Sequence, residues 1–487
     1  MTDVRNQLRF ILNDQDVVLD EISATRTLLD FLRLDRRMTG SKEGCAEGDC
    51  GACTVLVGRV TSGELVYESV NACICFVGSL DATHVVTVEH LSAANGPLHP
   101  VQQAMVEHHG SQCGFCTPGI VMSLYGMWMR NADPSVNDIE VALQGNLCRC
   151  TGYSPIIKAG QSISAYGKVV ADPLVVERQS IKARLEKLRD GRRVELGEGK
   201  DRIIVPASAD DLAEVYAGNP GGTLVSGATD VGLWVTKFMR DIGPMIFIGD
   251  IAGLQGIEAN EATLKLGAGV TYSAATAAVT RRFPQLTELW MRIGGQQVRN
   301  MGTIGANIAN GSPIGDTPPP LIALGAAITL RKGDVRREVK LEDFFIAYGK
   351  QDRQPGEFVE AVTIPSLPEG EQFACYKITK RKDEDISALC GAFRLRLEGG
   401  KVAAITITYG GMAATPKRAR AVEAALMGKA WTVATVEAAI PAFAEDYQPL
   451  TDMRASAEYR LLAAQNLLRR FFLETTGEGE RLTREVA

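Results

Sequence analysis

Histidine is scarce in this sequence and is confined to its first part. The sequence contains five histidines, His84, His90, His99, His108 and His109. Residues 110–487 therefore offer no imidazole for a Ser-His-Asp triad, for a histidine general base or for a histidine-ligated zinc ion. Any chemistry in that part must rely on other side chains or on a bound cofactor.

Long apolar runs and a large surplus of charge are also absent. No apolar run reaches the roughly 18 residues that a membrane span needs, and the start, MTDVRNQLRF, lacks the apolar core of a secretion signal. The net charge of −6 does not favour a surface for nucleic acid or anionic lipid. We therefore expect a soluble, cytoplasmic chain, and its 487 residues predict about three domains.

The dinucleotide fingerprint G-x-G-x-x-G is missing as well. The nearest string, GAGVTYS, lacks the last glycine, so a dinucleotide must be held in another way. LVSGATDV (224–231) places a glycine and a threonine after a predicted strand, as a backbone nest for a pyrophosphate requires. GTIGAN (302–307) and NGSPIGD (310–316) could form a second cradle. Each stretch alone could also be ordinary turn chemistry.

Cysteine, by contrast, is abundant, and nine of the eleven cysteines lie in the first 150 residues. Without a secretion signal, such clustering favours metal binding over a disulfide framework. Cys45, Cys50 and Cys53 have the spacing of plant-type [2Fe–2S] ferredoxins, and the glycines of this loop let backbone N–H groups approach cluster sulfurs. Either Cys73 or Cys75 could supply the fourth ligand. A structural zinc site is the alternative.

A second set of cysteines lies in predicted loops at helix ends: Cys113, Cys116, Cys148 and Cys150. Thr117-Pro118 predicts the N-cap and first turn of a helix over roughly 118–130, and a helix over 135–144 is stopped by Gly145. Because that helix has ended, the loop can turn both Cys148 and Cys150 inward. The spacing alone also fits zinc, but the neighbouring ferredoxin-like loop favours a second cluster, since paired clusters form an electron relay.

The other segments predict a mixture of helices and strands. Residues 7–19 predict a β-hairpin and residues 25–34 a helix, and further strands complete a small α+β unit. The charge-dense stretch 172–202 predicts a solvated linker with some helix. A glycine-rich α/β region begins at residue 203, and a further unit of strands and two helices begins near residue 373. Its two cysteines, Cys375 and Cys390, are expected to be buried small side chains.

Taken together, the motifs resemble the molybdenum hydroxylase (xanthine oxidase) family. The resemblance is carried by KEGCAEGDCGACTV, VNACIC, SQCGFCTPG, LCRCTGY, GATDVGL, GTIGANIANGSPIGDTPP, DISAL and DMRASAEYR. It implies a multidomain α+β protein. The implied parts are a β-grasp ferredoxin-like domain (1–92), a helical-bundle [2Fe–2S] domain (93–171), a linker (172–202), an α/β FAD-binding domain of the vanillyl-alcohol-oxidase/PCMH type (203–370) and a C-terminal α+β domain like that of CO dehydrogenase flavoprotein (371–480).

The resemblance also implies a set of cofactor contacts. One [2Fe–2S] cluster is assigned to Cys45, Cys50, Cys53 and Cys73, which leaves Cys75 spare, and the other to Cys113, Cys116, Cys148 and Cys150. The implied FAD contacts are Leu224, Val225, Ser226, Gly227, Ala228, Thr229, Asp230, Val231, Thr303, Gly305, Asn307, Asp316, Val359 and Lys377. Ile293 stands where some relatives carry an aromatic side chain facing the flavin. Asp316 could instead cap a helix or turn, and Lys377 could be a surface charge.

For function, the resemblance implies cofactor-borne chemistry with no catalytic side chain in this chain. Electrons would come from the molybdopterin cofactor of a separate large subunit that oxidises hypoxanthine and xanthine to urate. They would pass through the second cluster, then the first, to FAD and on to NAD+, in a heterotetramer of two small and two large subunits. The alternatives are a related hydroxylase of aldehydes or N-heterocycles, a standalone iron–sulfur flavoprotein, and a zinc-stabilised binding module.

Overall fold

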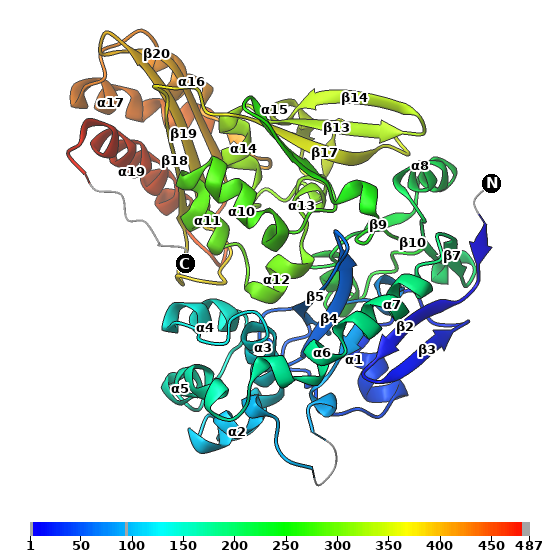
Figure 1. Ribbon diagram of the computed structural model, residues 1–487. Helices are drawn as coiled ribbons and strands as arrows, with labels where there is room; N and C mark the ends of the chain where they lie inside the picture. Colours follow the sequence, from blue (N-terminus) through cyan, green and yellow to red (C-terminus); the bar gives the residue numbers. More distant parts are fainter. Residues whose placement is uncertain (1–2, 93–95, 480–487) are drawn as a thin grey trace. The chain divides into compact units, whose positions relative to one another are not determined.

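The computed structural model describes residues 3–92 and 96–479, and the chain divides into two compact units. The first comprises Met1–Ile251 together with Gly294–Gly302, and the second comprises Ala252–Ile293 and Thr303–Ala487. Each unit has its own buried apolar clusters. The combination of several sheets with helices confirms the predicted multidomain α+β class (Figure 1).

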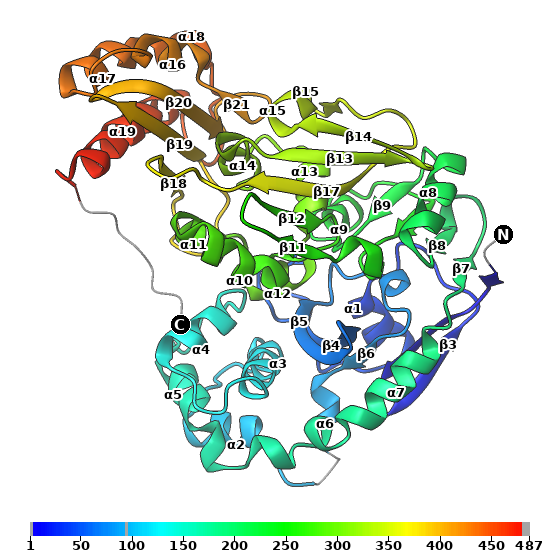
Figure 2. The same cartoon turned by 45° about the horizontal axis from the view of Figure 1, so that its top comes forward.

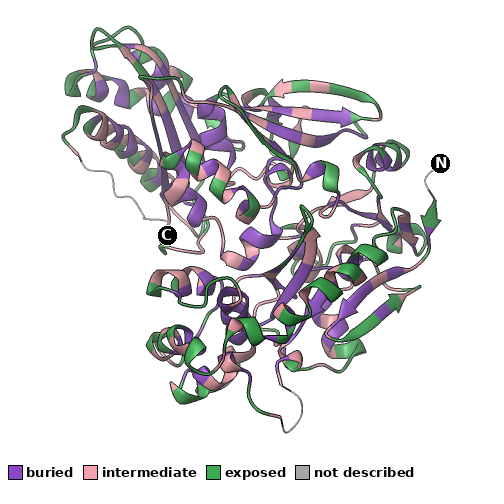
Figure 3. Ribbon diagram, in the orientation of Figure 1, coloured by how far each residue is buried: buried purple, intermediate pink, exposed green. Residues whose placement is uncertain are grey.

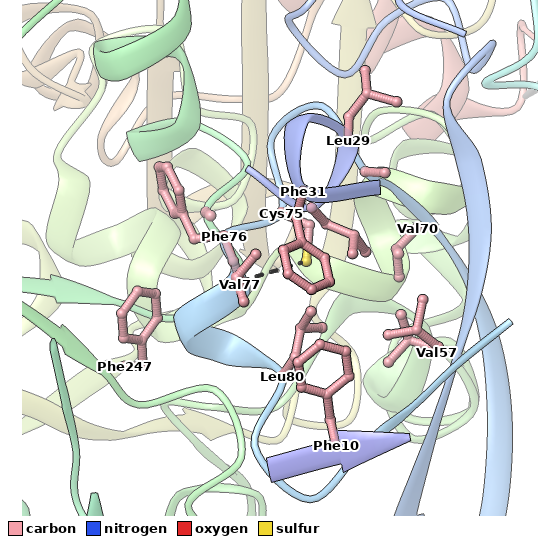
Figure 4. Packing of buried hydrophobic residues seen from close by; sticks show 14 of the residues in the cluster. Phe10, Leu29, Phe31, Val57, Val70, Cys75, Phe76, Val77, Leu80 and Phe247 are labelled. Atoms are coloured by element: carbon pink, nitrogen blue, oxygen red, sulfur yellow. Dashed lines mark hydrogen bonds between the residues drawn. The ribbon is translucent and has the colours of Figure 1, made fainter. Parts of the chain in front are cut away.

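In the first unit, the N-terminal segment forms a sheet with the strand order β3-β2-β6-β4-β5. Its strands are β2 (Leu8–Leu12), β3 (Gln15–Leu19), β4 (Thr54–Thr61), β5 (Glu64–Asn71) and β6 (His84–Val86). β2 and β3 form the predicted hairpin. The predicted helix is a short α1 (Leu28–Asp30) that continues as a π-helical turn, Phe31–Asp35. Phe10 of β2 and Phe31 meet edge-on in the core, with ring centroids 5.9 Å apart (Figure 4).

A group of helices follows: α2 (Pro100–Glu107), α3 (Thr117–Trp128), α4 (Val136–Leu143) and α5 (Ser154–Ser162). α3 packs against α2, α4 and β4, and all its residues from Gly119 to Trp128 are buried (Figures 2 and 3). The prediction that Thr117 caps α3 is wrong, because Cys116 occupies the N-cap position. The Thr117 hydroxyl is instead 2.7 Å from that of Ser111.

Residues 172–202 contain more regular structure than the term linker suggests. They form α6 (Pro173–Val176), α7 (Arg178–Leu188) and β7 (Arg193–Leu196). β7 joins a second sheet of order β1-β7-β8-β10-β9, whose other strands are β1 (Val4–Arg5), β8 (Ile203–Val205), β9 (Thr223–Val225) and β10 (Met245–Phe247). Val194 and Leu196 alternate with charged residues and are buried, so a strand pattern lies within the charge-dense stretch. The helices α8 (Ala209–Gly218), α9 (Val231–Thr236) and α12 (Gln296–Met301) also belong to this unit.

The second unit contains two main sheets. One has the order β11-β12-β17-β13-β14, with β11 (Ile257–Ala259), β12 (Thr263–Gly267), β13 (Ala327–Lys332), β14 (Val335–Lys340) and β17 (Phe358–Pro365). The other has the order β18-β19-β20-β21, with β18 (Gln372–Ile378), β19 (Leu389–Glu398), β20 (Lys401–Gly410) and β21 (Lys417–Arg418). A short pair, β15 (Phe345–Ala347) and β16 (Lys350–Gln351), lies between β14 and β17 in the sequence.

Helices in the second unit precede and follow these strands. They are α10 (Tyr272–Arg282), α11 (Thr287–Met291), α13 (Ile304–Asn310), α14 (Pro318–Leu324), α15 (Leu341–Phe344), α16 (Arg420–Leu426), α17 (Val433–Ala439), α18 (Phe443–Asp446) and α19 (Ala457–Thr476). α16 packs on β20, and α19 packs on β18 and β19, so the C-terminal part is a sheet covered by helices, as predicted (Figure 1).

The predicted domain limits remain predictions. The predicted FAD-binding domain, 203–370, is divided between the two compact units, since β8 to β10 belong to the first and β11 onward to the second. The predicted start at residue 1, the boundary at residue 93 and the end at residue 480 lie outside the described residues.

Candidate functional site

The first cysteine loop connects the π-helical turn to β4, and β5 brings a fourth cysteine to it. The N–H of Cys50 donates to Cys45 Sγ over 3.3 Å. The thiol of Cys45 is within hydrogen-bonding reach of those of Cys50 and Cys73, and Cys73 is within reach of Cys53. The structure therefore brings Cys45, Cys50, Cys53 and Cys73 together, although their role as ligands remains a prediction.

The crowding of these sulfurs shifts their proton affinities in opposite directions. Hydrogen bonds from the thiols of Cys50 and Cys73 lower the pKa of Cys45. The hydrogen bond to Cys45 raises the pKa of Cys50, and that of Cys73 is raised for the same reason. Thiolates this close together oppose one another's ionisation, so a cationic centre would favour the thiolate form of the set.

Cys75 does not join this set. It is buried in the apolar core, among Phe31, Val77 and Leu80 (Figure 4). Its Sγ lies 3.6 Å from Ser79 Oγ, and burial raises the pKa of its thiol. A neutral thiol in an apolar pocket behaves as a small hydrophobic side chain, so Cys75 packs the core.

The second set of cysteines forms two close pairs. Cys113 and Cys150 are exposed, with their sulfurs 3.6 Å apart. Cys116 and Cys148 form the other pair, and burial, together with a hydrogen bond to Cys148, raises the pKa of Cys116 to about 12. Tyr153, held at φ 66, points its hydroxyl at the N–H of Cys148, which donates to it over 2.8 Å.

Among the described residues, no group of three or more His, Cys, Asp or Glu side chains has an arrangement that could hold a metal ion. A [2Fe–2S] cluster makes a different demand, because its four thiolates are divided between two irons. The gathering of four cysteines in the first set, and the two pairs of the second, fit this donor chemistry.

The two cysteine loops are in direct contact. The N–H of Leu147, next to Cys148, donates to the carbonyl of Cys50 over 3.0 Å. Gly51 has φ 65, and a Cβ there would lie 2.0 Å from the carbonyl oxygen of Gly145, so only glycine permits this approach. The amide of Asn146 donates to the carbonyl of Gly51 over 3.1 Å. Backbone and side-chain hydrogen bonds therefore join the two loops.

A buried glutamine, which the sequence analysis missed, ties these loops to α12. Gln297 Nε2 lies 3.2 Å from Thr54 Oγ1, 3.2 Å from Ser123 Oγ and 2.9 Å from Asn146 Oδ1. Thr54 follows Cys53, and Asn146 lies two residues before Cys148. Nothing in the local sequence signals this role, because the contacts join segments more than 150 residues apart.

In the first unit, the predicted FAD contacts at residues 224–231 form a strand, a tight turn and the start of a helix. Leu224 and Val225 end β9, Ser226 to Asp230 form the turn, and Val231 begins α9. Ala228 has φ 57, and a Cβ on Gly227 would lie 1.7 Å from the carbonyl oxygen of Met301. The left-handed conformation of Ala228 is compatible with the predicted backbone nest, which remains a prediction.

In the second unit, Lys377 and Asp316 form a buried ion pair. Lys377 Nζ lies 2.5 Å from Asp316 Oδ2 and 2.9 Å from Ser387 Oγ, and Ser387 Oγ lies 2.5 Å from Asp316 Oδ1. Lys377 is only 8% exposed, so the alternative of a surface charge is wrong. Ser387 completes a closed triangle of polar groups, and the sequence analysis did not identify it.

Three further predicted FAD residues lie in or next to α13. Thr303 caps this helix by accepting a hydrogen bond from the N–H of Ala306, and Gly305 packs so closely on Ala268 that a Cβ would lie 2.4 Å from the alanine Cβ. Asn307 Oδ1 is buried and has no hydrogen-bond partner among the described residues. Such an unsatisfied acceptor fits a donor supplied by a bound molecule, and so it fits FAD.

The last two predicted contacts lie in apolar surroundings. Val359 is buried in β17, opposite Leu330 of β13. Ile293, which follows α11, packs against the core of the second unit. Both positions remain predictions as flavin contacts.

The chain matches four protein-family models. These are a 2Fe-2S iron-sulfur cluster binding domain over residues 10–78, a [2Fe-2S] binding domain over 87–161, the FAD binding domain in molybdopterin dehydrogenase over 198–367, and the CO dehydrogenase flavoprotein C-terminal domain over 374–475. Among solved structures, it is 30% identical to a chain of carbon monoxide dehydrogenase from Hydrogenophaga pseudoflava, with a TM-score of 0.52, over 55% of this chain and 93% of that one. The chain belongs to the molybdenum hydroxylase family.

Other members of the molybdenum hydroxylase family are similar over most of this chain. It is 31% identical to xanthine dehydrogenase of Emericella nidulans over 97% of its length, and 30% identical to xanthine dehydrogenase/oxidase of Rattus norvegicus over 96%. It spans 39% of the length of each of these relatives. Quinoline 2-oxidoreductase from Pseudomonas putida 86 has a chain that is 25% identical, with a TM-score of 0.51, over 56% of this chain and 96% of that one.

The family models identify two [2Fe–2S]-binding domains and an FAD-binding domain in this chain. The helices within the described ranges, 3–92 and 96–479, include none that is long and apolar enough to cross a bilayer.

Proposed function

We propose that this chain is the electron-transfer component of a xanthine dehydrogenase. The observation that carries the proposal is the direct contact between the two cysteine loops, in which the Leu147 N–H donates to the Cys50 carbonyl over 3.0 Å. An electron relay requires its two redox centres to lie close together, and loops joined by hydrogen bonds hold them close. Two independent structural metal sites would not need such a contact. The similarity to xanthine dehydrogenases over 96–97% of the chain supports the choice of substrate.

The residues of this chain would hold the cofactors and orient them. When bound, the two [2Fe–2S] clusters and FAD supply one-electron transfer and hydride delivery to NAD+. Cys45, Cys50, Cys53 and Cys73 would ligate one cluster, and Cys113, Cys116, Cys148 and Cys150 the other. In the first unit, the turn at 226–230 remains a predicted FAD contact. In the second unit, Asn307 and the Lys377–Asp316–Ser387 triangle would offer polar groups to FAD.

A molybdopterin-binding partner would dock over the second cysteine set. Cys113 and Cys150 are exposed, and the apolar side chains of Phe115 and Leu147 beside them are 47% and 56% exposed. Large apolar side chains exposed next to a redox centre favour a protein interface, because a partner would both bury them and shorten the distance for electron transfer. We propose a heterotetramer with two copies of each component.

A related hydroxylase is the second candidate. The similarity to carbon monoxide dehydrogenase and to quinoline 2-oxidoreductase fits a related enzyme of the family equally well. Its substrate would be an aldehyde or an N-heterocycle. Substrate recognition would belong to the molybdopterin-binding partner, so the contacts within this chain favour neither substrate.

Purification from the native host, with metal and flavin analysis and low-temperature EPR, tests the proposal. We expect four irons per chain, two for each cluster, together with FAD and a co-purifying molybdenum protein. Turnover of xanthine with NAD+ would support the first candidate, and turnover of quinoline or an aldehyde without xanthine turnover would support the second. Two irons or fewer in reconstituted protein would contradict the relay.

A further inference from the structure

Near the first cysteine set, the side-chain amide of Asn71 is buried and both of its polar atoms lack a hydrogen-bond partner among the described residues. Asn71 is the last residue of β5, two residues before Cys73, and its exposed fraction is 0%. Buried side-chain amides in native proteins almost always have partners, so a group from outside the polypeptide is the natural partner here.

The backbone of Asn71, in contrast, is fully used. Its carbonyl accepts from the N–H groups of Ile74 and Cys75, each over 3.2 Å, and its own N–H points at Met301 Sδ over 3.4 Å. These bonds form the turn that delivers Cys73 to the site. These backbone hydrogen bonds therefore hold Asn71 in place, and only its side-chain carboxamide has unsatisfied hydrogen-bonding groups.

The surroundings of this carboxamide point to the first cysteine set. Asn71 stands opposite Thr54, which directly follows Cys53. Its Nδ2 is 3.7 Å from where a Cβ on Gly48 would lie, and Gly48 is in the middle of the loop between Cys45 and Cys50. The amide thus lies between the loop that carries two of the four cysteines and the strand ends that carry the other two.

We propose that the side-chain amide of Asn71 donates a hydrogen bond to a sulfur of the [2Fe–2S] cluster held by Cys45, Cys50, Cys53 and Cys73, and thereby raises its reduction potential. This inference rests on the cluster site proposed above. Cluster sulfurs can only accept hydrogen bonds, and they become more negative when the cluster gains one electron. A donor therefore stabilises the reduced form more than the oxidised form.

The test is an EPR-monitored redox titration of the cofactor-loaded full chain, with dithionite supplying the electron. In Asn71→Leu, which keeps the shape and removes the donor, the ratio of reduced to oxidised first cluster at a fixed potential should fall several-fold. A tenfold fall corresponds to 59 mV for a one-electron couple. The second cluster and the flavin should keep their potentials. Asn71→Asp should lower the ratio of reduced to oxidised cluster further, because a carboxylate cannot donate and repels the added electron. This variant provides the test if Asn71→Leu does not assemble its cluster.

Asn300→Leu is the matched control. Asn300 is also a buried asparagine of the same unit, but its Nδ2 donates to Ser69 O over 2.9 Å and lies 3.2 Å from Ser69 Oγ. Its loss should leave the cluster potential unchanged and should lower the thermal stability of the iron-free chain. Asn71→Leu should leave the stability of the iron-free chain equal to or above that of the unmodified chain, because it removes unsatisfied polar groups.

The outcomes separate this inference from the proposed function. If the first cluster is present and its potential is unchanged in both Asn71 variants, or if only the flavin potential shifts, the inference is wrong and the relay stands. Loss of stability of the iron-free Asn71→Leu chain to the same degree as Asn300→Leu would also overturn it, since that result would indicate a purely structural amide. Absence of iron at this site in the unmodified chain would overturn the proposed function itself.

Discussion

At the scale of single residues, neighbouring cysteines have different roles that are set by what surrounds each sulfur. Cys73 reaches the sulfurs of Cys45 and Cys53, whereas Cys75, two residues later, is enclosed by apolar side chains and Ser79. The spacing in the sequence permitted either one as the fourth ligand. The turn held by the carbonyl of Asn71 separates the two thiols and favours Cys73 as the predicted ligand, because it directs the first thiol to the loop and the second into the core.

We predict that Cys148→Ser abolishes one of the two [2Fe–2S] EPR signals and lowers the iron content by half. The serine hydroxyl is a far weaker iron ligand than a thiolate, and Cys148 is the buried member of its pair. The first cluster signal should persist. Cys75→Ser is the matched control and should retain both signals, so loss of either signal in that variant would contradict the assignment of Cys73.

His84 provides a pH-dependent prediction. Burial lowers the pKa of His84 to about 4, and the neutral ring is held between Tyr67 OH and the carbonyl of Asn13, each at 2.7 Å. In the unfolded chain the pKa is near 6.5, so between pH 6.5 and pH 4 the unfolded state binds more protons than the folded state. This contribution to stability is therefore complete above pH 6.5 and is lost as the pH falls toward 4, by about 3 kcal/mol in total.

Urea unfolding of the full chain at a series of pH values measures this effect. His84→Gln should flatten the decline between pH 6.5 and pH 4. His109→Asn is the control, because His109 is exposed and its φ of 52 suits asparagine, and it should leave the decline unchanged. A decline of the same slope in His84→Gln would show that other groups are responsible.

At the scale of elements, close backbone approaches at glycine bring the two cysteine loops together. Gly51 meets the carbonyl of Gly145, and a Cβ on Gly119 of α3 would lie 2.0 Å from the carbonyl oxygen of Gly51. Three glycines from separate segments therefore form one contact. The sequence showed a glycine-rich cysteine loop and a glycine that ends a helix, but it carried no sign that the two glycines touch, because contacts between distant segments leave no local pattern.

We predict that Gly51→Ala impairs both clusters, because the added methyl group would have to displace the backbone of the other loop. Both the unfolding midpoint and the iron content should fall clearly. Gly63→Ala is the matched control: Gly63 has φ 80, and no atom of the described residues lies within 4 Å of its Cβ position. It should cost only the strain of a left-handed alanine, about 1–2 kcal/mol, and should leave the iron content unchanged. Equal loss of iron in both variants would contradict the contact.

At the scale of the whole molecule, the two compact units are not continuous stretches of the sequence. The segment Gly294–Gly302 lies between residues of the second unit in the sequence but belongs to the first unit, where Gln297 meets Thr54 and Asn146. The predicted FAD-binding domain is likewise shared by the two units. Domain boundaries drawn from composition and motifs follow the sequence, so they cannot anticipate a segment that returns to an earlier unit.

We predict that Asn307→Leu lowers the amount of bound FAD without lowering the stability of the FAD-free chain. Asn307 Oδ1 is a buried acceptor with no partner among the described residues, so leucine removes an unsatisfied group and also removes the atom proposed to accept from FAD. Flavin absorbance after purification and the thermal midpoint of the FAD-free chain measure the two effects. Asn260→Leu is the control at an exposed turn and should retain FAD; FAD retention in Asn307→Leu would contradict the contact.

The sequence by itself determined the chemistry that the chain can support. The cysteine spacings predicted two sets of sulfur ligands, and the glycine-rich stretches predicted cradles for a dinucleotide. The alternation of apolar residues predicted the hairpin, whereas helical spacing and capping residues predicted several helices. These features depend on local spacing and on residue type, which the sequence states directly. The resemblance carried by the same motifs identified the family.

Only the tertiary structure decided how these parts are combined. It gathered Cys73 with the first loop and left out Cys75, joined the Leu147 N–H to the Cys50 carbonyl, and buried Lys377 against Asp316 and Ser387. It also left the amide of Asn71 buried without a hydrogen-bond partner among the residues that the structure describes. Each of these depends on the packing of segments that are distant in the sequence or on burial, and both arise only when the apolar cores form.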